Sequence, residues 1–410
     1  MFRSLISSRT RRAWIGVFLS VCLLLAMLPP RAAALDASSP IVPLPYLDGI
    51  GTLSAKAAVL MDESSGQLLY AKNESLPLPM ASTTKIMTAL CAVELADVNG
   101  VIEVDPAAVG IEGSSVYLYA NESLTLTQLL YALLLESAND AAVAIAIGIS
   151  GSVEAFAAQM NEKARELGLE NTHFENPHGL DGETHYTTAH DLALIAREAL
   201  RHPLLRTIFA TGKITIPLNG SEGVRSLQNH NKMLRNYDGA IGVKTGFTKK
   251  SGRCLVSAAE RDGLTLIAVT LCAPDDWNDH ERMLDAGFAA LERVTLCARG
   301  GFETLLPITG GREGYVIVQN ATAQAVTLPR NRGSMLCTVE LPRFLYAAVY
   351  EGESVGQLVF RCDVDGDGVP EDIARIPLKT TYAVEQRGRI GLLRRLWDRL
   401  TGRSDRISYL

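Results

Sequence analysis

The chain has 410 residues, of which 47% are hydrophobic and 20% are charged, and its formal net charge is −6 at pH 7. This length and composition predict a globular protein whose large core is divided between two domains. The acidic balance argues against nucleic acid as a general partner, because phosphate binding needs a basic surface.

The N-terminus has the composition of a secretory signal peptide. An apolar run from Trp14 to Leu28 follows basic residues and is succeeded by three alanines at 32–34, which form an A-x-A cleavage site. We therefore expect residues 1–34 to be removed and the remaining chain to be exported. An uncleaved membrane anchor is the alternative, which the shortness of the apolar run disfavours.

A serine and a lysine stand three residues apart where a helix is expected over 83–96, after a β-hairpin over 57–71. This spacing places the side chains of Ser82 and Lys85 on one helical face. A serine hydroxyl becomes a nucleophile when a base takes its proton, and a lysine is such a base only if burial or a second cation removes its own proton. An N-cap serine followed by a solvated lysine is the structural alternative.

Ser137 and Asn139 interrupt two largely apolar helices that we expect over 124–136 and 140–148. Buried polar side chains need partners, so this pair either caps the helices or faces a cleft.

An amphipathic helix is expected next, over 156–167, and a further helix over 188–200 is expected to begin at a Thr187 or Thr188 cap. The loop between them, 171–190, contains four histidines. Their spacing matches no zinc motif, so we expect hydrogen bonds that order the loop in preference to a metal site.

Beyond Lys213 the sequence alternates like β-strands, and a helix over 276–291 is expected to cover the sheet. Lys244, Thr245 and Gly246 lie on or beside a strand, where the glycine permits close approach of another backbone or a ligand. The expected strands cover residues 214–218, 224–228, 254–259 and 264–271.

Six cysteines follow the signal segment with no C-x-x-C and no zinc-like spacing, so we interpret them as mostly buried thiols. Cys254 and Cys272 flank the last expected hairpin, and a favourable register would allow a disulfide between them.

Short alternating segments separated by Gly, Pro and Asn predict a small all-β domain over 299–384. The expected strands cover residues 316–319, 325–328, 335–340, 346–350, 356–361 and 373–378. The run Asp363–Gly368 looks like the start of a calcium loop. Ala374 stands where the bidentate glutamate should be, so we expect a charged hairpin turn instead.

The last segment, 385–410, is expected to be a basic amphipathic helix that lies on an anionic membrane surface. A solvated helix packed on the β domain is the alternative. The residues of its apolar face are Ile390, Leu393, Leu396, Trp397 and Leu400.

Three short motifs now stand in a fixed order: S-x-x-K at 82–85, S-x-N at 137–139 and K-T-G at 244–246. Together they resemble those of the active-serine penicillin-recognising family, which includes penicillin-binding proteins and serine β-lactamases. The P-x-A-S-T-T-K setting, the N-P-H-G-L loop at 176–180, the β domain and the tail are similar to those of low-molecular-mass D-alanyl-D-alanine carboxypeptidases of the peptidase S11 type.

The resemblance implies an α+β fold. A β-lactamase/transpeptidase-like catalytic domain, with an antiparallel sheet covered by helices and a helical subdomain, would occupy residues 35–298. The β domain and the tail would follow it.

The resemblance also implies a serine-type D-Ala-D-Ala carboxypeptidase that removes the terminal D-alanine from peptidoglycan pentapeptide stems, outside the cytoplasmic membrane and without metal or organic cofactor. β-Lactams would acylate the same serine and inhibit the enzyme. Ser82 would be the nucleophile, Lys85 its base, and Ser137 the relay that carries a proton to the leaving amine.

The remaining matched positions would bind substrate. Asn139 would bind the substrate amide, and Thr245 would hydrogen-bond the terminal carboxylate. Lys244 would attract that carboxylate and keep Lys85 neutral through its charge. Gly246 would let the strand lie against the peptide, and the N–H groups of Ser82 and Phe247 would form the oxyanion hole.

Alternative functions remain open at this point. A β-lactamase is disfavoured because no residue matches the deacylating glutamate of class A enzymes, which also often have aspartate where Ala138 stands. A D,D-endopeptidase would use the same scaffold. A noncatalytic penicillin or muropeptide sensor would acylate without turnover, and a structural envelope protein would not be labelled by penicillin at all.

Overall fold

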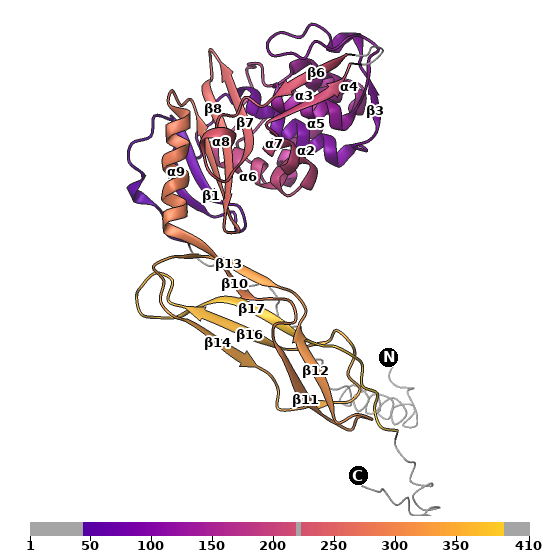
Figure 1. The fold of residues 1–410 in the computed structure, drawn as a ribbon, viewed down its shortest axis with the longest axis vertical. Helices are drawn as coiled ribbons and strands as arrows, with labels where there is room; N and C mark the ends of the chain where they lie inside the picture. Colours follow the sequence, from indigo (N-terminus) through magenta and orange to yellow (C-terminus); the bar gives the residue numbers. More distant parts are fainter. Residues whose placement is uncertain (1–43, 219–222, 389–410) are drawn as a thin grey trace, which may run out of the picture.

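The structure is a computed structural model that describes residues 44–218 and 223–388. The expected signal peptide and residues 389–410 of the expected tail lie outside this range. Figure 1 shows a body of helices and strands joined through β10 (Leu291–Cys297) and β13 (Gln324–Pro329) to an elongated part made of strands. Within the described ranges no single helix is long and apolar enough to cross a membrane. One bent pair, Asn139–Ser150 with Val153–Glu166, could do so by length and composition only.

A five-stranded antiparallel sheet organises the first part of the chain. Both hairpins expected from the sequence are confirmed, β1 with β2 and β8 with β9. Strand β7, which carries the K-T-G motif, lies at one edge, so one side of its backbone has no strand partner in this sheet. The strand order is β2 (Leu68–Lys72), β1 (Ala57–Asp62), β9 (Leu264–Leu271), β8 (Gly252–Arg261) and β7 (Ala240–Thr248).

Helices cover both faces of this sheet. Strand β1 is buried along its whole length, and its side chains alternate between two apolar clusters, with Val59 in one and Leu60 in the other. Helix α9 (Asp276–Ala290), predicted from the sequence, contributes to the second cluster, and α6 (Ala189–Leu200) contributes to the first. The sheet is therefore the middle layer of a three-layer body.

The other helices of the body agree with the sequence analysis in most places. Thr188 caps α6 as expected. The helix expected from Leu124 begins at Leu126, because Thr125 and Gln128 form a capping box after a short strand, β4 (Ser123–Thr125), which pairs with β3 (Val101–Glu103). Helix α7 (Pro203–Ala210) was not predicted. The remaining helices are α2 (Lys85–Leu95), α3 (Leu126–Leu135), α4 (Asn139–Ser150), α5 (Val153–Glu166) and the short α8 (Met233–Asn236); β5 (Lys213–Pro217) and β6 (Val224–Gln228) form a separate hairpin.

The strand-rich part has its own apolar core, as a separate small β domain should. Strands β10 and β11 were not predicted, and the strand expected over 346–350 is reduced to β15 (Leu345–Tyr346). Residues 385–388 are not helical; Gln386 bridges to Gly311 in extended conformation. The six-stranded sheet has the order β14 (Met335–Glu340), β16 (Ser354–Cys362), β17 (Glu371–Thr380), β12 (Tyr315–Asn320), β11 (Glu303–Thr309) and β15.

Two local expectations are settled in the same regions. The six cysteines in the described part of the chain are free thiols. Leu255 pairs with Thr270, which is one step away from the register that would set Cys254 opposite Cys272. The acidic run lies in the turn between β16 and β17, as predicted, and Asp363 accepts hydrogen bonds there from the backbone N–H of Gly366 and Gly368. That this turn holds no calcium stays a prediction.

Candidate active site

Ser82 lies in a single 3-10 turn, Ala81–Thr84, which leads directly into α2. The sequence predicted regular helix from Thr83. The difference begins at Ala81, whose φ of 49° lies in the left-handed region that residues other than glycine rarely adopt. This turn brings Ser82 against β7: a Cβ at Gly246 would lie 3.1 Å from the Ser82 nitrogen, so the glycine permits the contact.

Lys85 is fully buried, and its Nζ has three oxygen partners. The Ser82 Oγ lies at 3.0 Å, the Asn139 Oδ1 at 2.7 Å and the backbone oxygen of His178 at 2.6 Å. A neutral amine has two N–H groups and one lone pair. The two carbonyl oxygens accept the two N–H groups, which leaves the lone pair for the Ser82 O–H.

The surroundings of Lys85 favour this neutral form. Burial is the largest cause that lowers the pKa of Lys85 well below its ordinary value, and the charge of Lys244 lowers it further, whereas Asp140 raises it. Lys244 is also buried, and burial lowers its pKa to about 7. Burial and a second cation are the two influences that a lysine base requires.

Ser137 and Asn139 lie at the junction of α3 and α4, as the sequence indicated. Ser137 has a φ of 59° and lines the cleft. The amide of Asn139 is buried, with its oxygen on Lys85 and its Nδ2 donating to the backbone oxygen of Glu112 at 2.6 Å. Asn139 thus contacts Lys85 directly, a contact that its distance in sequence did not predict.

The backbone of β7 faces the turn around Ser82. The Thr248 N–H donates to the Ser251 Oγ inside the β7–β8 hairpin. Successive N–H groups of a strand point to opposite sides, so the Phe247 N–H points to the free edge of the sheet. The Phe247 side chain is 66% exposed, and the Nζ of Lys244 donates to the Thr245 backbone oxygen at 2.9 Å.

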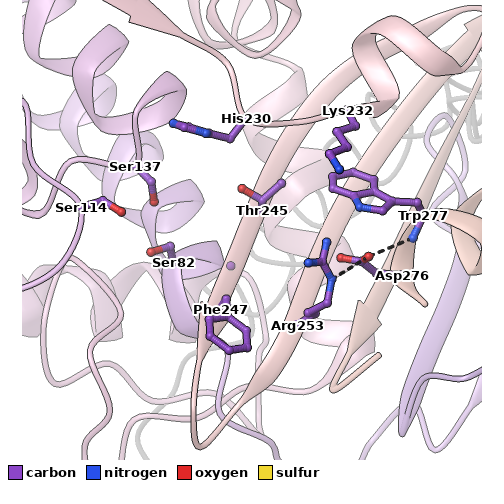
Figure 2. A pocket seen from close by; sticks show the side chains of 11 residues that line it. Ser82, Ser114, Ser137, His230, Lys232, Thr245, Phe247, Arg253, Asp276 and Trp277 are labelled. Atoms are coloured by element: carbon purple, nitrogen blue, oxygen red, sulfur yellow. Dashed lines mark hydrogen bonds and ion pairs between the residues drawn. The ribbon is translucent and has the colours of Figure 1, made fainter. Parts of the chain in front are cut away.

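A cleft of about 400 Å³ opens between this edge and the helices. Figure 2 shows Ser82, Ser114 and Ser137 on the helical side, with Thr245 and Phe247 facing them from β7. The sequence analysis missed the far wall, where Arg253 donates to Asp276 at 2.9 Å beside Trp277. Trp277 is one of three tryptophans, which was the only signal for that wall. His230 and Lys232 also line the cleft.

The histidine-rich loop supplies backbone and ring hydrogen bonds, as expected. Pro177 accepts a hydrogen bond from the Thr88 Oγ1 at 2.6 Å, next to the contact between His178 and Lys85. The His173 Nδ1 lies 2.8 Å from the Thr184 backbone oxygen. The contacts of Pro177 and His178 attach the loop to α2, and the contact of His173 lies within the loop.

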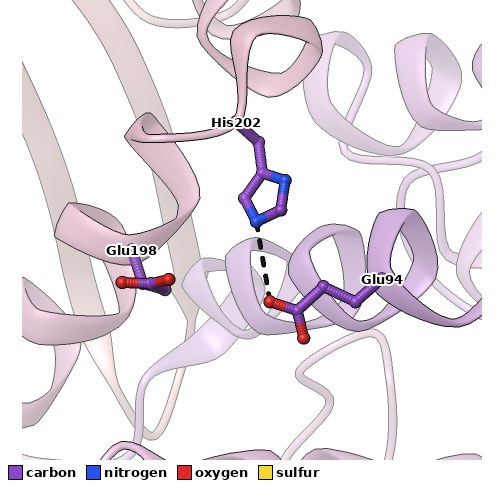
Figure 3. Close-up of side chains that lie close together, drawn as sticks. All are labelled: Glu94, Glu198 and His202. Atoms are coloured by element: carbon purple, nitrogen blue, oxygen red, sulfur yellow. Dashed lines mark ion pairs between the residues drawn. The ribbon is translucent and has the colours of Figure 1, made fainter. Parts of the chain in front are cut away.

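Among the described residues, two groups outside the cleft have side chains that could hold a metal ion: Asp363, Asp365 and Asp367 in the β16–β17 turn, and a second group between helices. Figure 3 shows Glu94, Glu198 and His202, whose ligand atoms lie within 4.8 Å of one another. The Lys163 Nζ lies 2.8 Å from Glu94, and Arg201 lies 2.9 Å from Glu198. Both carboxylates are therefore already paired with cations, and the group is an ion-pair network between helices.

A family profile matches most of the helix–sheet body. The profile described as D-alanyl-D-alanine carboxypeptidase, Peptidase S11, matches residues 45–275.

Curated relatives agree with this match. The chain is 31% identical over 353 residues to the D-alanyl-D-alanine carboxypeptidase DacF of Bacillus subtilis, covering 83% of this chain and 88% of the relative. It is 30% identical over 372 residues to the D-alanyl-D-alanine carboxypeptidase DacC of Escherichia coli, covering 85% and 88%.

Two solved structures have the same fold. Penicillin-binding protein 5 of Haemophilus influenzae aligns with a TM-score of 0.64 at 28% identity, over 85% of this chain and 100% of that one. A mutant of the Streptomyces K15 DD-transpeptidase aligns with a TM-score of 0.56 at 32% identity, over 58% of this chain and 99% of that one. The helix–sheet body thus has the β-lactamase-like catalytic fold of both structures, and the α+β architecture of body and β domain together is that of penicillin-binding protein 5.

Proposed function

The chain belongs to the D-alanyl-D-alanine carboxypeptidase family, peptidase S11, and on that premise we propose that Ser82 is the residue acylated by its substrate. The protein is a serine-type carboxypeptidase that removes the terminal D-alanine from peptidoglycan stem peptides, and it binds penicillin. Its substrate is part of the cell wall, so it acts outside the cytoplasm. The three-way contact of Lys85 with Ser82, Asn139 and the His178 backbone supports the assignment of the nucleophile.

Acylation begins when Lys85 accepts the Ser82 proton and the Oγ attacks the carbonyl carbon between the last two D-alanines. The oxyanion lies between the N–H groups of Ser82 and Phe247, an interaction whose loss typically costs about 2.7–4 kcal/mol per donor. The C–N bond then breaks, and Ser137 passes the proton to the departing amine. Free D-alanine and a Ser82 ester remain.

Deacylation repeats the same steps with water. Lys85 accepts a proton from the water that attacks the ester carbonyl, and the proton returns to Ser82 as the C–O bond breaks. The shortened peptide leaves with a new carboxylate. A β-lactam enters this pathway by opening its ring on Ser82, and no metal or organic cofactor takes part in any step.

The other matched residues bind the substrate or orient Lys85. Thr245, which lines the cleft, hydrogen-bonds the terminal carboxylate, and the charge of Lys244 behind it attracts that carboxylate. Gly246 keeps β7 close enough for the peptide to lie along it. Asn139 orients Lys85 through its oxygen, in addition to the proposed contact with the substrate amide.

Labelling with a fluorescent penicillin, run beside D-alanine release from a pentapeptide ending in D-Ala-D-Ala, tests this function. We expect the native protein to be labelled and to release D-alanine, and Ser82→Ala to do neither. Ser152→Ala, which removes an N-cap hydroxyl of α5, is the matched control and should retain both activities. Labelled Ser82→Ala would refute the nucleophile; labelling without D-alanine release would indicate a sensor, and rapid penicillin hydrolysis a β-lactamase.

We also propose that the exported enzyme is held at the outer face of the cytoplasmic membrane by its C-terminal residues. The described chain approaches its end beside Gly310, where the Arg387 N–H donates to the Gly310 oxygen at 2.8 Å. Figure 1 places β11 and β12, which flank this point, in the part of the molecule away from the helix–sheet body. A membrane-bound tail would therefore leave the helix–sheet body, which contains the cleft, separated from the membrane by the β domain.

Deletion of residues 387–410 tests the anchor. The shortened protein should move from the membrane fraction to the soluble fraction while its penicillin labelling stays unchanged. Unchanged recovery in the membrane fraction would refute this role of the tail.

A further inference from the structure

The peptide bond between Ala81 and Ser82 lies at the centre of a chain of hydrogen bonds that the proposed mechanism does not use. The Ala81 oxygen accepts from the Thr84 Oγ1 at 2.8 Å. The same hydroxyl lies 2.8 Å from the His185 Nε2, and the Glu175 N–H donates to the His185 Nδ1 at 3.0 Å. Thr84 and His185 are both buried, so these contacts are shielded from water.

The direction of each bond in this chain follows from its first donor. A backbone N–H can only donate, so the Nδ1 of His185 is an acceptor and its proton is on Nε2. The Nε2–H then donates to Thr84, whose own proton is left for Ala81. In the other tautomer Nε2 would accept the Thr84 proton, and the Ala81 oxygen would lose its partner.

Neutral His185 is required for this arrangement, since the imidazolium has no acceptor. Burial lowers the pKa of His185 to about 4, so the ring is neutral at pH 7. Its ring also packs edge-on against Phe174, with centroids 5.9 Å apart, which fixes the ring plane.

The orientation of the Ala81 oxygen decides where the Ser82 N–H points. In a planar trans peptide the C=O and the N–H point in opposite directions. Two glycines mark the two ends of this peptide: a Cβ at Gly179 would lie 2.0 Å from the Ala81 oxygen, and one at Gly246 would lie 3.1 Å from the Ser82 nitrogen. The Ser82 N–H is thus directed toward β7. The Phe247 N–H points outward from the free edge of that strand, which faces the turn around Ser82.

We propose that His185 and Thr84 are positioning residues that hold the Ser82 N–H in the oxyanion hole. They touch neither the substrate nor the reacting atoms, and they act through the Ala81–Ser82 peptide. This inference rests on the proposed acylation of Ser82. It adds that the left-handed conformation at Ala81 is maintained by a buried hydrogen-bond chain that begins in the loop 171–190.

The acyl-enzyme carbonyl reports directly on this N–H. A carbonyl polarised by two N–H donors absorbs at lower infrared frequency than one with a single good donor. We expect Thr84→Val to raise the carbonyl stretching frequency of the β-lactam acyl-enzyme and to slow acylation about 10-fold or more, with KM changed less than 2-fold. His185→Phe retains the packing against Phe174, loses the donor and should have the same effects.

Two further variants separate positioning from general destabilisation. His185→Gln retains an N–H donor near the Nε2 position and should recover part of the rate. Thr83→Val removes a neighbouring buried hydroxyl that donates to the Met80 oxygen at 2.6 Å. The Met80 oxygen belongs to the peptide unit that carries the Ala81 N–H and not the Ser82 N–H. The carbonyl stretching frequency of this variant should therefore equal that of the native acyl-enzyme.

The outcomes distinguish this inference from the proposed acylation of Ser82, on which it rests. Unchanged carbonyl frequencies in Thr84→Val and His185→Phe would overturn the positioning role while leaving Ser82 as the nucleophile. A shift of equal size in Thr83→Val would also overturn it, as would an acylation rate in His185→Gln no higher than that in His185→Phe. Penicillin labelling of Ser82→Ala would instead show that Ser82 is not the nucleophile.

Discussion

The two parts of the molecule bury polar side chains of different kinds. The helix–sheet body buries two lysines, Lys85 and Lys244, together with polar groups such as Asn139 and His185. Within the described residues of the β domain, the buried polar side chains are all uncharged: Asn320, Thr327, Gln357 and Thr380. Among its described residues the body also buries six carboxylates. Removing a charge from water costs several kcal/mol, so such groups need polar partners, and the two buried lysines have theirs at the candidate active site.

The comparison therefore assigns activity to the body and its two buried lysines, and to the β domain a stability of its own. Substitutions that break this division would refute it.

Lys85→Met should have the largest effect, on activity. Loss of a general base typically costs about 10²–10⁴-fold, and we expect penicillin acylation to slow about 10³-fold. The rate of fluorescent labelling measures it. Lys163→Met, which removes a lysine paired with Glu94 at 2.8 Å, is the control and should acylate normally. Acylation of Lys85→Met within about 10-fold of the native rate would exclude Lys85 as the base.

Leu378→Ala should affect stability and leave activity unchanged. Leu378 is fully buried in the β-domain core, and truncation of such a leucine costs about 2–5 kcal/mol. We expect a lower unfolding temperature for this domain and a native acylation rate. Leu305→Ala is the matched exposed control, since Leu305 is 60% exposed. A slowed acylation rate in folded Leu378→Ala would mean that the two parts are coupled.

Acid should destabilise the body through its buried histidines. Burial lowers the pKa of His178 and His280 to about 3 and that of His185 to about 4. The unfolded chain takes up protons below about pH 6.5 and the folded chain does not, so the free energy of unfolding falls as pH falls. Each histidine contributes about 2 kcal/mol of this loss at pH 5.

Urea unfolding at pH 7 and pH 5, followed by the helical circular dichroism signal, measures this loss. All helices in the described part of the chain belong to the body, so the signal reports on that part. His280→Gln should reduce the pH dependence. An equal dependence in the variant would contradict the assignment.

Lys244→Met should have the smallest effect of the four. Loss of its charge raises the pKa of Lys85, so the rise of the acylation rate with pH should move to higher pH. A shift of one pKa unit lowers the neutral fraction of Lys85, and hence the rate, about 10-fold at a pH below that pKa. Substrate KM should also rise. Lys250→Met is the control, because Lys250 is exposed and donates to the Gly182 oxygen at 3.1 Å. An unshifted pH profile of the acylation rate would mean that the charge of Lys244 does not lower the pKa of Lys85.

Elements with a strong local signal were predicted well from the sequence. The hairpins of the central sheet and helix α9 follow from periodicity and turn residues, and α6 begins at the threonine cap that was expected. The misses have physical causes. Helix α7 is too short to show a clear helical period in the sequence. Strand β10 follows α9 with no turn residue between them, so the change from helical to strand periodicity had no marker.

The contact of Ser82 with Lys85 follows from the sequence alone, because three residues are nearly one helical turn and local geometry leaves little freedom. What surrounds that pair depends on tertiary packing. Asn139 and the His178 backbone oxygen are far from Lys85 in sequence, and a backbone oxygen has no side-chain signature. Burial removes Lys85 from water and lowers its pKa, and burial is a property of the whole fold.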